Sequence, residues 1–164
     1  MEGAHRPGHF NGVALVVSKL FNIIEPDKAY FGQKDYQQFK IISQLANDLL
    51  FDVDLIAVPT VREPSGLAKS SRNSRLSDKG RSLASKIHDV LSSLETRLLK
   101  GDTFSILKPL AVSELEHSDL KVEYLEFVNE ETMYPIDCKN DNVLAVLCIA
   151  VTVDGIRLID NKIF

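Results

Sequence analysis

The first sixty or so residues alternate between helix-like and strand-like patterns, and this alternation constrains the fold more than any other feature of the sequence. Apolar residues recur with helical spacing from Asn11, which we expect to cap the helix, to Pro26, which ends it. The strand-like run "KAYFG" follows at residues 28–32. A second helical pattern begins at Asp35, and the apolar run "VDLIAV" at residues 53–58 is typical of a strand covered on both faces. This order predicts half of a doubly wound α/β sheet.

A different order of elements follows residue 61. The long polar stretch "REPSGLAKSSRNSRLSDKG" precedes a predicted helix at about residues 78–100 and another near residues 103–116, which contains Pro109. "KVEYLEFV" and "NVLAVLCIAVTV" are typical of strands, and the dipeptide Asp154-Gly155 predicts a hairpin into "IRLID". We therefore expect a small α+β unit with antiparallel strands, and we place the domain boundary so that residues 1–61 and 62–164 form separate domains.

Composition and charge exclude several classes of protein. With 45% hydrophobic and 26% charged residues, the sequence is that of a folded globular protein. The net charge of −4 argues against a dedicated nucleic-acid binder, and the longest apolar runs are too short to span a bilayer, so we expect neither a nucleic-acid nor a membrane partner. Cys138 and Cys148 lack CxxC spacing, and no export signal is visible. We therefore expect a cytoplasmic protein with both thiols buried or half-buried.

The stretch "FGQKDYQQ" lies where the first predicted strand ends, and open α/β sheets bind ligands at such strand ends. Gly32 permits close approach of a ligand to the backbone, and Lys34 can reach phosphate oxygens. Asp35 can cap the next helix or accept a hydrogen bond from a hydroxyl group, and Gln38 lies one turn into that helix. The alternative interpretation is an ordinary strand-to-helix turn with a solvated lysine.

A second polar cluster, "AKSSRN", follows the next predicted strand. Its members Lys69, Ser70, Ser71 and Arg72 combine hydroxyl groups with cations in a loop preceded by glycine, which suits the clamping of a phosphate. The alternative interpretation is a flexible, solvated linker. Two such clusters at neighbouring strand ends favour a phosphate site more than either does alone, but the residues themselves leave both interpretations open.

Two histidines near the start of the chain have the spacing of a helical metal-binding pair, but the residues between them do not favour the helix that such a pair needs. His5 and His9 are four residues apart, but Pro7 between them argues against a helical metal-binding pair, so we predict no metal site formed by protein side chains. Arg6 and His9 are better candidates for contact with an anion. The chain contains neither a Walker loop nor a GxGxxG fingerprint.

Two long stretches carry a family resemblance. "RPGHFNGVALVVSKLFNIIEPDKAYFGQKDYQQ" and "VPTVREPSGLAKSSRNSRLS" closely resemble the pantothenate synthetase (pantoate–β-alanine ligase) family, and the resemblance extends from about residue 2 to the end. That family is similar to class I aminoacyl-tRNA synthetases. The resemblance therefore implies an α/β fold, with a partial Rossmann-like parallel sheet in residues 1–61. It further implies a small α+β lid domain with an antiparallel sheet in residues 62–164, including a mobile phosphate-binding loop at residues 65–77.

The resemblance also implies an activity. The family uses ATP to convert pantoate to pantoyl adenylate with release of pyrophosphate, and the amine of β-alanine then displaces AMP to give pantothenate. Pantoate, β-alanine and ATP would be the small-molecule partners, Mg²⁺ would accompany the nucleotide, and the full-length protein could form a homodimer. Two alternatives stay open: a non-catalytic nucleotide-binding or interaction module, and another adenylyl or nucleotidyl transferase of the same fold.

Site residues carry over from the family one by one. Lys34 and Arg72 would stabilise charge on the α-phosphate and are the predicted catalytic residues. Pantoate would contact Gln38, Arg6 and His9. The predicted ATP-binding residues are Gly32, Gln33, Lys34, Asp35, Val61, Lys69, Ser70, Ser71 and Arg72.

The chain departs from the family pattern in two places. Lys69 stands where the family usually has methionine. More importantly, the family's HxGH signature, whose histidines bind phosphates, has no match in this sequence. We therefore expect a C-terminal part of such an enzyme, with Met1 an internal methionine of the family, half of the ATP site present, and no activity of the isolated chain.

Overall fold

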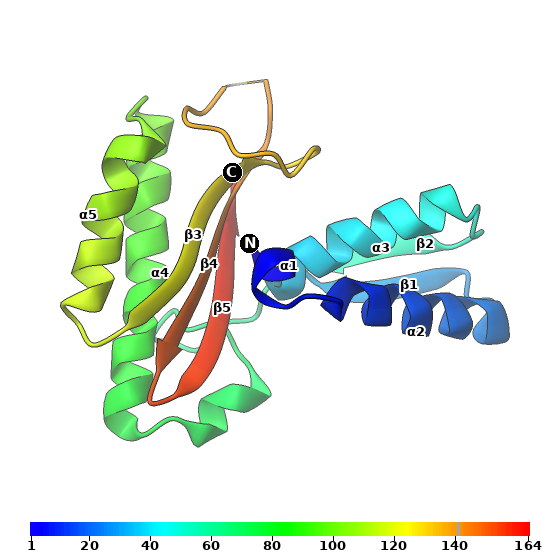
Figure 1. Cartoon of the computed structure of the whole chain (residues 1–164), viewed down its shortest axis with the longest axis horizontal. Helices are drawn as coiled ribbons and strands as arrows, with labels where there is room; N and C mark the ends of the chain where they lie inside the picture. Colours follow the sequence, from blue (N-terminus) through cyan, green and yellow to red (C-terminus); the bar gives the residue numbers. More distant parts are fainter. Residues whose placement is uncertain (141) are drawn as a thin grey trace. The chain divides into compact units, whose positions relative to one another are not determined.

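The computed structural model describes residues 1–140 and 142–164. The chain divides into two compact units, Met1–Thr60 and Val61–Phe164, whose elements are labelled in Figure 1. Among the described residues, no helix is both long and apolar enough to cross a membrane.

The first unit contains a two-stranded parallel sheet with its helices. Its elements are α1 (Glu2–His5), α2 (His9–Ile24), β1 (Lys28–Gly32), the 3₁₀ helix η1 (Gln33–Asp35), α3 (Tyr36–Asp48) and β2 (Asp54–Val58). The strands pair in parallel, from Lys28 opposite Asp54 to Gly32 opposite Val58, with α3 as the crossover between them. This parallel pairing confirms the α/β order predicted from the sequence.

Two expectations for the first unit were wrong. The helix α2 begins at His9 with Gly8 as its N-cap, so Asn11 lies in the first turn and does not cap the helix. Gly8 has a φ of +76°, which glycine adopts without strain, and this allows the helix to begin before Asn11. The strand β2 is not covered on both faces: Asp54 and Val58 are exposed and the residues between them are half-buried. A sheet of two strands covers less of β2 than a full doubly wound sheet would.

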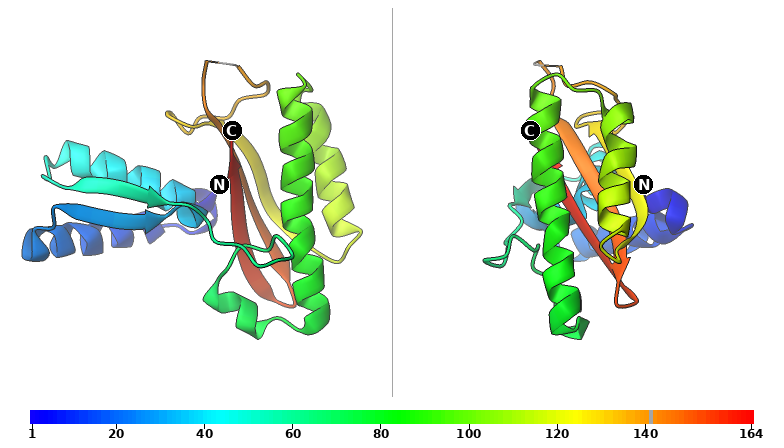
Figure 2. Two further views of the ribbon diagram at one scale, coloured as in Figure 1. Left: turned by 180° about the vertical axis from the view of Figure 1, so that it is seen from behind. Right: turned by 90° about the vertical axis from the view of Figure 1, so that its left-hand side faces the viewer.

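The second unit packs two helices on a three-stranded antiparallel sheet. Its elements are the 3₁₀ helix η2 (Ser71–Arg75), α4 (Asp78–Leu99), α5 (Phe104–Glu116), β3 (Lys121–Asn129), β4 (Ala145–Val153) and β5 (Ile156–Ile163). The strand order is β3-β4-β5. Figure 2 shows α4 and α5 side by side against the sheet, and the contacts place α4 over β4 and β5 and α5 over β3. The antiparallel α+β arrangement confirms the predicted fold class.

Local sequence explains the hairpin and the core of this unit. Asp154 and Gly155 have φ values of +53° and +71°, as a two-residue hairpin turn requires, and they join β4 to β5. Pro109 lies inside α5, which continues through it. The core lies between the helices and the sheet and includes the fully buried side chains of Leu91, Leu98, Leu107, Leu115, Phe127, Leu147 and Ile149.

The two cysteines have different environments. Cys148 is buried in the central strand β4, and desolvation there raises the pKa of its thiol to about 12, which suppresses the reactive thiolate. Cys138 is exposed in the connection between β3 and β4, so the expectation that both thiols are buried or half-buried was wrong for Cys138.

The hairpin turn is also tied to the start of α4. The carboxylate of Asp154 accepts hydrogen bonds from Ser77 N–H at 3.0 Å and Ser77 Oγ at 2.7 Å, and these bonds lower the pKa of Asp154. Ser77 caps α4, because its Oγ accepts from Gly80 N–H at 2.9 Å. A Cβ atom at Gly80 would lie 1.9 Å from Asp154 Oδ2, so glycine is needed for this close approach. The C-terminal end of the polar stretch is therefore fixed in place.

Candidate functional site

The first polar cluster follows the carboxyl end of β1. Gly32 has an extended backbone (φ −67°, ψ 128°), and no other described residue except its chain neighbours comes within 4 Å of the position that a Cβ would take. Neither strain nor packing in the first unit therefore calls for glycine here, and the open space over its backbone suits a ligand. Gln33 and Lys34 follow in η1 and are half-buried. Asp35 occupies the N-cap position of α3, but its exposed side chain makes no capping hydrogen bond.

The other residues predicted in the first unit lie on its helices. Gln38 is half-buried in the first turn of α3. Arg6 and His9 lie on either side of the break between α1 and α2 and contact each other, since Arg6 Nη1 is 3.2 Å from His9 Nε2. A guanidinium group can only donate, so Nε2 of His9 is the acceptor of this bond. Arg6 also donates to Glu2 Oε1 at 3.3 Å.

The second cluster is preceded by a tight hairpin formed by residues 61–69. Lys69 N–H donates to the carbonyl oxygen of Val61 at 2.9 Å, and Arg62 pairs with Ala68 in an antiparallel bridge. Val61 itself is 61% exposed.

The turn of this hairpin depends on glycine. Gly66 has a φ of +84°, and its N–H donates to the carbonyl oxygen of Glu63 at 2.9 Å. A Cβ at this position would lie 2.4 Å from His88 Cδ2, so a larger residue is excluded by both backbone conformation and packing. The hydrogen bonds and the bridge of residues 61–69 therefore form a hairpin in this part of the polar stretch.

The predicted phosphate-binding residues follow the hairpin directly. Ser70 caps η2, because its Oγ accepts from Arg72 N–H at 3.2 Å. Lys69, Ser71 and Arg72 are exposed. An open hollow of about 710 Å³ is lined by Glu63, Lys69, Ser70, Ser71, Asn73, Ser74 and Arg81. Hydroxyl donors and cations on one open surface suit an anion with several oxygens, such as a phosphate group.

Four residues that line this hollow were not among the predicted site residues: Glu63, Asn73, Ser74 and Arg81. Asn73 is only 4% exposed although it lies in the middle of a polar run. Nothing in the sequence distinguishes a buried asparagine from a solvated one, because the composition around Asn73 is that of a loop. The two clusters belong to different units, with Gly32–Gln38 in the first and Lys69–Arg72 in the second.

Comparison with known proteins gives a family match over almost the whole chain. Residues 1–163 match the family model described as pantoate-beta-alanine ligase. Relatives named pantothenate synthetase include those of Cytophaga hutchinsonii, 48% identical over 172 residues, and Thermosipho africanus, 44% identical over 162 residues. These alignments cover 99% and 98% of this chain but 58% of each relative, so the chain spans little more than half of their length.

Solved structures agree with this match. The crystal structure of a pantoate-beta-alanine ligase (pantothenate synthetase) from Thermus thermophilus is 38% identical, with a TM-score of 0.88, and the comparison covers 99% of this chain and 58% of that one. A pantoate-beta-alanine ligase from Francisella tularensis, complexed with beta-gamma ATP and beta-alanine, is 34% identical with a TM-score of 0.74. That comparison covers 99% of this chain and 53% of the Francisella chain.

Proposed function

Because the chain belongs to the pantoate-beta-alanine ligase family, we propose that it forms part of an enzyme that uses ATP to join pantoate to β-alanine. The observation that carries the proposal is the family match over residues 1–163, which includes both polar clusters. The ligands of the Francisella complex support ATP and β-alanine as substrates. No observation favours the alternatives, an interaction module or a different nucleotidyl transferase.

The proposed ATP site draws on both clusters. Each cluster offers groups that suit a nucleotide: open backbone at Gly32, a cation at Lys34, and hydroxyl groups and cations next to the hollow described above. The residues assigned to ATP are Gly32, Gln33, Lys34 and Asp35 in the first unit, and Val61, Lys69, Ser70, Ser71 and Arg72 in the second.

The proposed first step needs no protein nucleophile. A carboxylate oxygen of pantoate attacks the α-phosphorus of ATP, the bond from this phosphorus to the bridging oxygen breaks, and pyrophosphate leaves with the electron pair. Negative charge grows on the phosphoryl oxygens during this exchange, and the cations of Lys34 and Arg72 stabilise it. In the second step the amine of β-alanine attacks the acyl carbon, loses a proton and displaces AMP.

The pantoate-binding residues of the proposal are Gln38, Arg6 and His9. The amide of Gln38 can hydrogen-bond a hydroxyl or carboxylate oxygen, and Arg6 can pair with the carboxylate. The contact between Arg6 and His9 keeps the two side chains together on one surface of the first unit.

Mg²⁺ enters the proposal as the ion that accompanies the nucleotide. It would be bound mainly by the nucleotide phosphates and water, as is usual for this ion, and it would neutralise phosphate charge. Within residues 1–140 and 142–164, no group of three or more His, Cys, Asp or Glu side chains could hold a metal ion. The proposal also keeps a cytoplasmic location, a homodimer of the full-length protein and the absence of a nucleic-acid partner.

A chimera tests the proposal. Residues 1–163 of this chain would replace the matching part of the Cytophaga hutchinsonii pantothenate synthetase, which is 58% of its length. We expect the chimera to form pantothenate with AMP and pyrophosphate. Arg72→Ala should lower kcat by ~10²–10³, because it removes a donor to developing charge. Gln38→Ala should instead raise the KM for pantoate roughly tenfold or more, since a substrate hydrogen bond is lost.

Arg75→Ala is the matched control, because it removes another exposed cation from the same short helix η2. It should leave both constants within about twofold of the parent chimera, in the usual range for exposed surface changes. A folded chimera without pantothenate formation, or equal losses in the Arg72 and Arg75 variants, would contradict the proposed function.

A further inference from the structure

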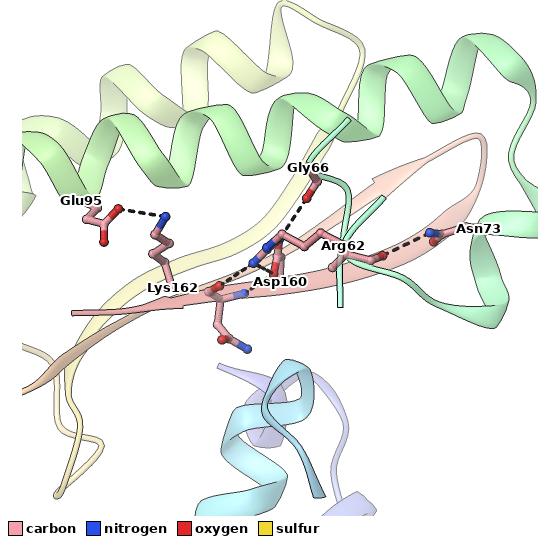
Figure 3. Close-up of polar contacts among 8 residues, drawn as sticks. Arg62, Gly66, Asn73, Glu95, Asp160 and Lys162 are labelled. Atoms are coloured by element: carbon pink, nitrogen blue, oxygen red, sulfur yellow. Dashed lines mark hydrogen bonds and ion pairs between the residues drawn. The ribbon is translucent and has the colours of Figure 1, made fainter. Parts of the chain in front are cut away.

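The segment Lys69–Arg72 is held from one side by an ion pair between distant parts of the second unit. Figure 3 shows Arg62, at the base of the hairpin, pointing at Asp160 of β5. Arg62 Nη1 and Nη2 donate to the two carboxylate oxygens at 2.6 and 3.0 Å, and the Asp160 side chain is only 3% exposed. Arg62 also donates to the carbonyl oxygens of Gly66 at 3.0 Å and Asn161 at 3.3 Å. One guanidinium group thus fixes both the turn of the hairpin and its distance from β5.

The segment is held from its other side by Asn73. The Asn73 Nδ2 atom donates to Glu63 Oε1 at 2.9 Å and to the carbonyl oxygen of Ala68 at 3.1 Å, so it connects η2 to both strands of the hairpin. Arg81 of α4 donates to the Glu63 carboxylate at 3.3 Å and to the carbonyl oxygen of Asn73 at 3.0 Å. Because Lys69–Arg72 lies between Ala68 and Asn73, polar contacts hold both of its ends, and the contact between Asn73 and Ala68 is buried.

We propose that Arg62, Asp160 and Asn73 are positioning residues for the segment Lys69–Arg72. They hold its hydroxyl groups and cations in the geometry that receives the phosphate groups before the nucleotide arrives. This inference rests on the proposed function. Binding is stronger when fewer backbone and side-chain torsions must be ordered at the moment of contact, so a preformed segment binds more tightly than a mobile one of the same composition.

Two isosteric substitutions weaken or remove these contacts in the full chain. Asp160→Asn removes the charge that pairs with Arg62, while Asn73→Asp replaces the amide donor by a carboxylate facing Glu63. The matched control is Glu95→Gln. It weakens the 2.9 Å ion pair between Glu95 and Lys162, which also involves β5, but that pair joins β5 to α4 and not to the hairpin (Figure 3).

Three measurements on each variant test the inference. These are the ¹⁵N heteronuclear NOE of residues 69–75 without nucleotide, the melting temperature, and the affinity for Mg·ATP from NMR titration. We expect lower NOE values for residues 69–75 in Asp160→Asn and Asn73→Asp, and affinities weakened on the order of tenfold. Glu95→Gln should keep wild-type NOE values for residues 69–75 and an affinity for Mg·ATP within about twofold of the wild type. This should hold even if its melting temperature falls as much as in the positioning variants.

The outcomes separate the inference from the proposed function. Wild-type NOE values in both positioning variants would overturn the inference. The inference would also be overturned if the loss of affinity for Mg·ATP had the same relation to the fall in melting temperature in all three variants. If the wild-type chain binds no ATP, the assignment of the two clusters to ATP fails in the isolated chain, and the chimera remains the test of the proposed function. The NOE comparison still decides whether these residues order the segment. Asn73→Asp leaves the Arg62–Asp160 pair intact, so it carries the test if Asp160→Asn is too unstable to study.

Discussion

The purified 164-residue chain, supplied with ATP, Mg²⁺, pantoate and β-alanine, is expected to form no measurable pantothenate. The family resemblance assigns phosphate binding to the histidines of an HxGH signature, and these 164 residues contain no such signature. Removing one donor to the developing charge typically costs ~10²–10³ in rate, so the loss of two histidines should cost roughly 10⁴ or more. Mass-spectrometric detection of pantothenate after prolonged incubation is the appropriate measurement.

The control for this experiment is the same preparation carrying Arg72→Ala, which removes a proposed catalytic cation but retains any contaminating enzyme. Equal background in both preparations agrees with the expectation. Turnover by the wild-type chain that disappears in the Arg72 variant would show that the chain is catalytically complete, and the expectation of inactivity would be wrong.

Hydrogen exchange should show that the second unit is far more stable than the first. The structure buries few apolar side chains in the first unit, namely Phe21, Tyr36, Ile42 and Ala46, while Ile23, Ile24 and Leu50 are 79%, 63% and 88% exposed. The second unit has a continuous core between its helices and sheet. Burial of a leucine or isoleucine side chain contributes about 1.5–3 kcal/mol to the free energy of unfolding. The second unit buries several more such side chains than the first, so the local stability of the two units should differ greatly.

We therefore expect amides of β4 to be protected at least ~10³-fold more than amides of α2 and α3, a difference of about 4 kcal/mol. Equal protection in both units would contradict this expectation. Sedimentation at the same protein concentration is the control, because a second copy covering the apolar side chains of α2 would raise the protection of the first unit.

Much of the fold could be predicted from the sequence because its signals are local. The sequence predicted a helix at about residues 78–100, where the structure has α4, and the dipeptide Asp154-Gly155 identified the β4–β5 hairpin from the backbone conformation it favours. The start of α2 could not be predicted, because an asparagine is a common N-cap and Gly8 gave no stronger signal. The exposure of Cys138 depends on a connection between strands that has no periodicity.

The candidate site was predictable only in part, because some of its residues have a local signal in the sequence and others do not. Strand ends mark places where ligands bind, and this rule, together with the family resemblance, drew attention to Lys34 and to the segment Lys69–Arg72. The residues that hold the segment gave no such signal. Arg62 and Asp160 are 98 positions apart, and only the folded sheet brings them together. Side-chain hydrogen bonds of this kind follow from tertiary structure and leave no pattern in a short window of sequence.

An NMR titration of the full chain with Mg·ATP tests most directly whether both clusters contribute to nucleotide binding. Charge-assisted hydrogen bonds to phosphate contribute about 1.5–3 kcal/mol each before ordering costs, so we expect a Kd no better than roughly millimolar. Shifts should appear in residues 32–38 and 61–72, and Lys34→Ala and Arg72→Ala should each weaken binding. Lys28→Ala at the opposite end of β1 and Arg75→Ala in η2 are the matched controls and should bind as the wild type does. Shifts confined to other residues, or affinities that neither Lys34→Ala nor Arg72→Ala changes, would contradict the assignment of these clusters to ATP.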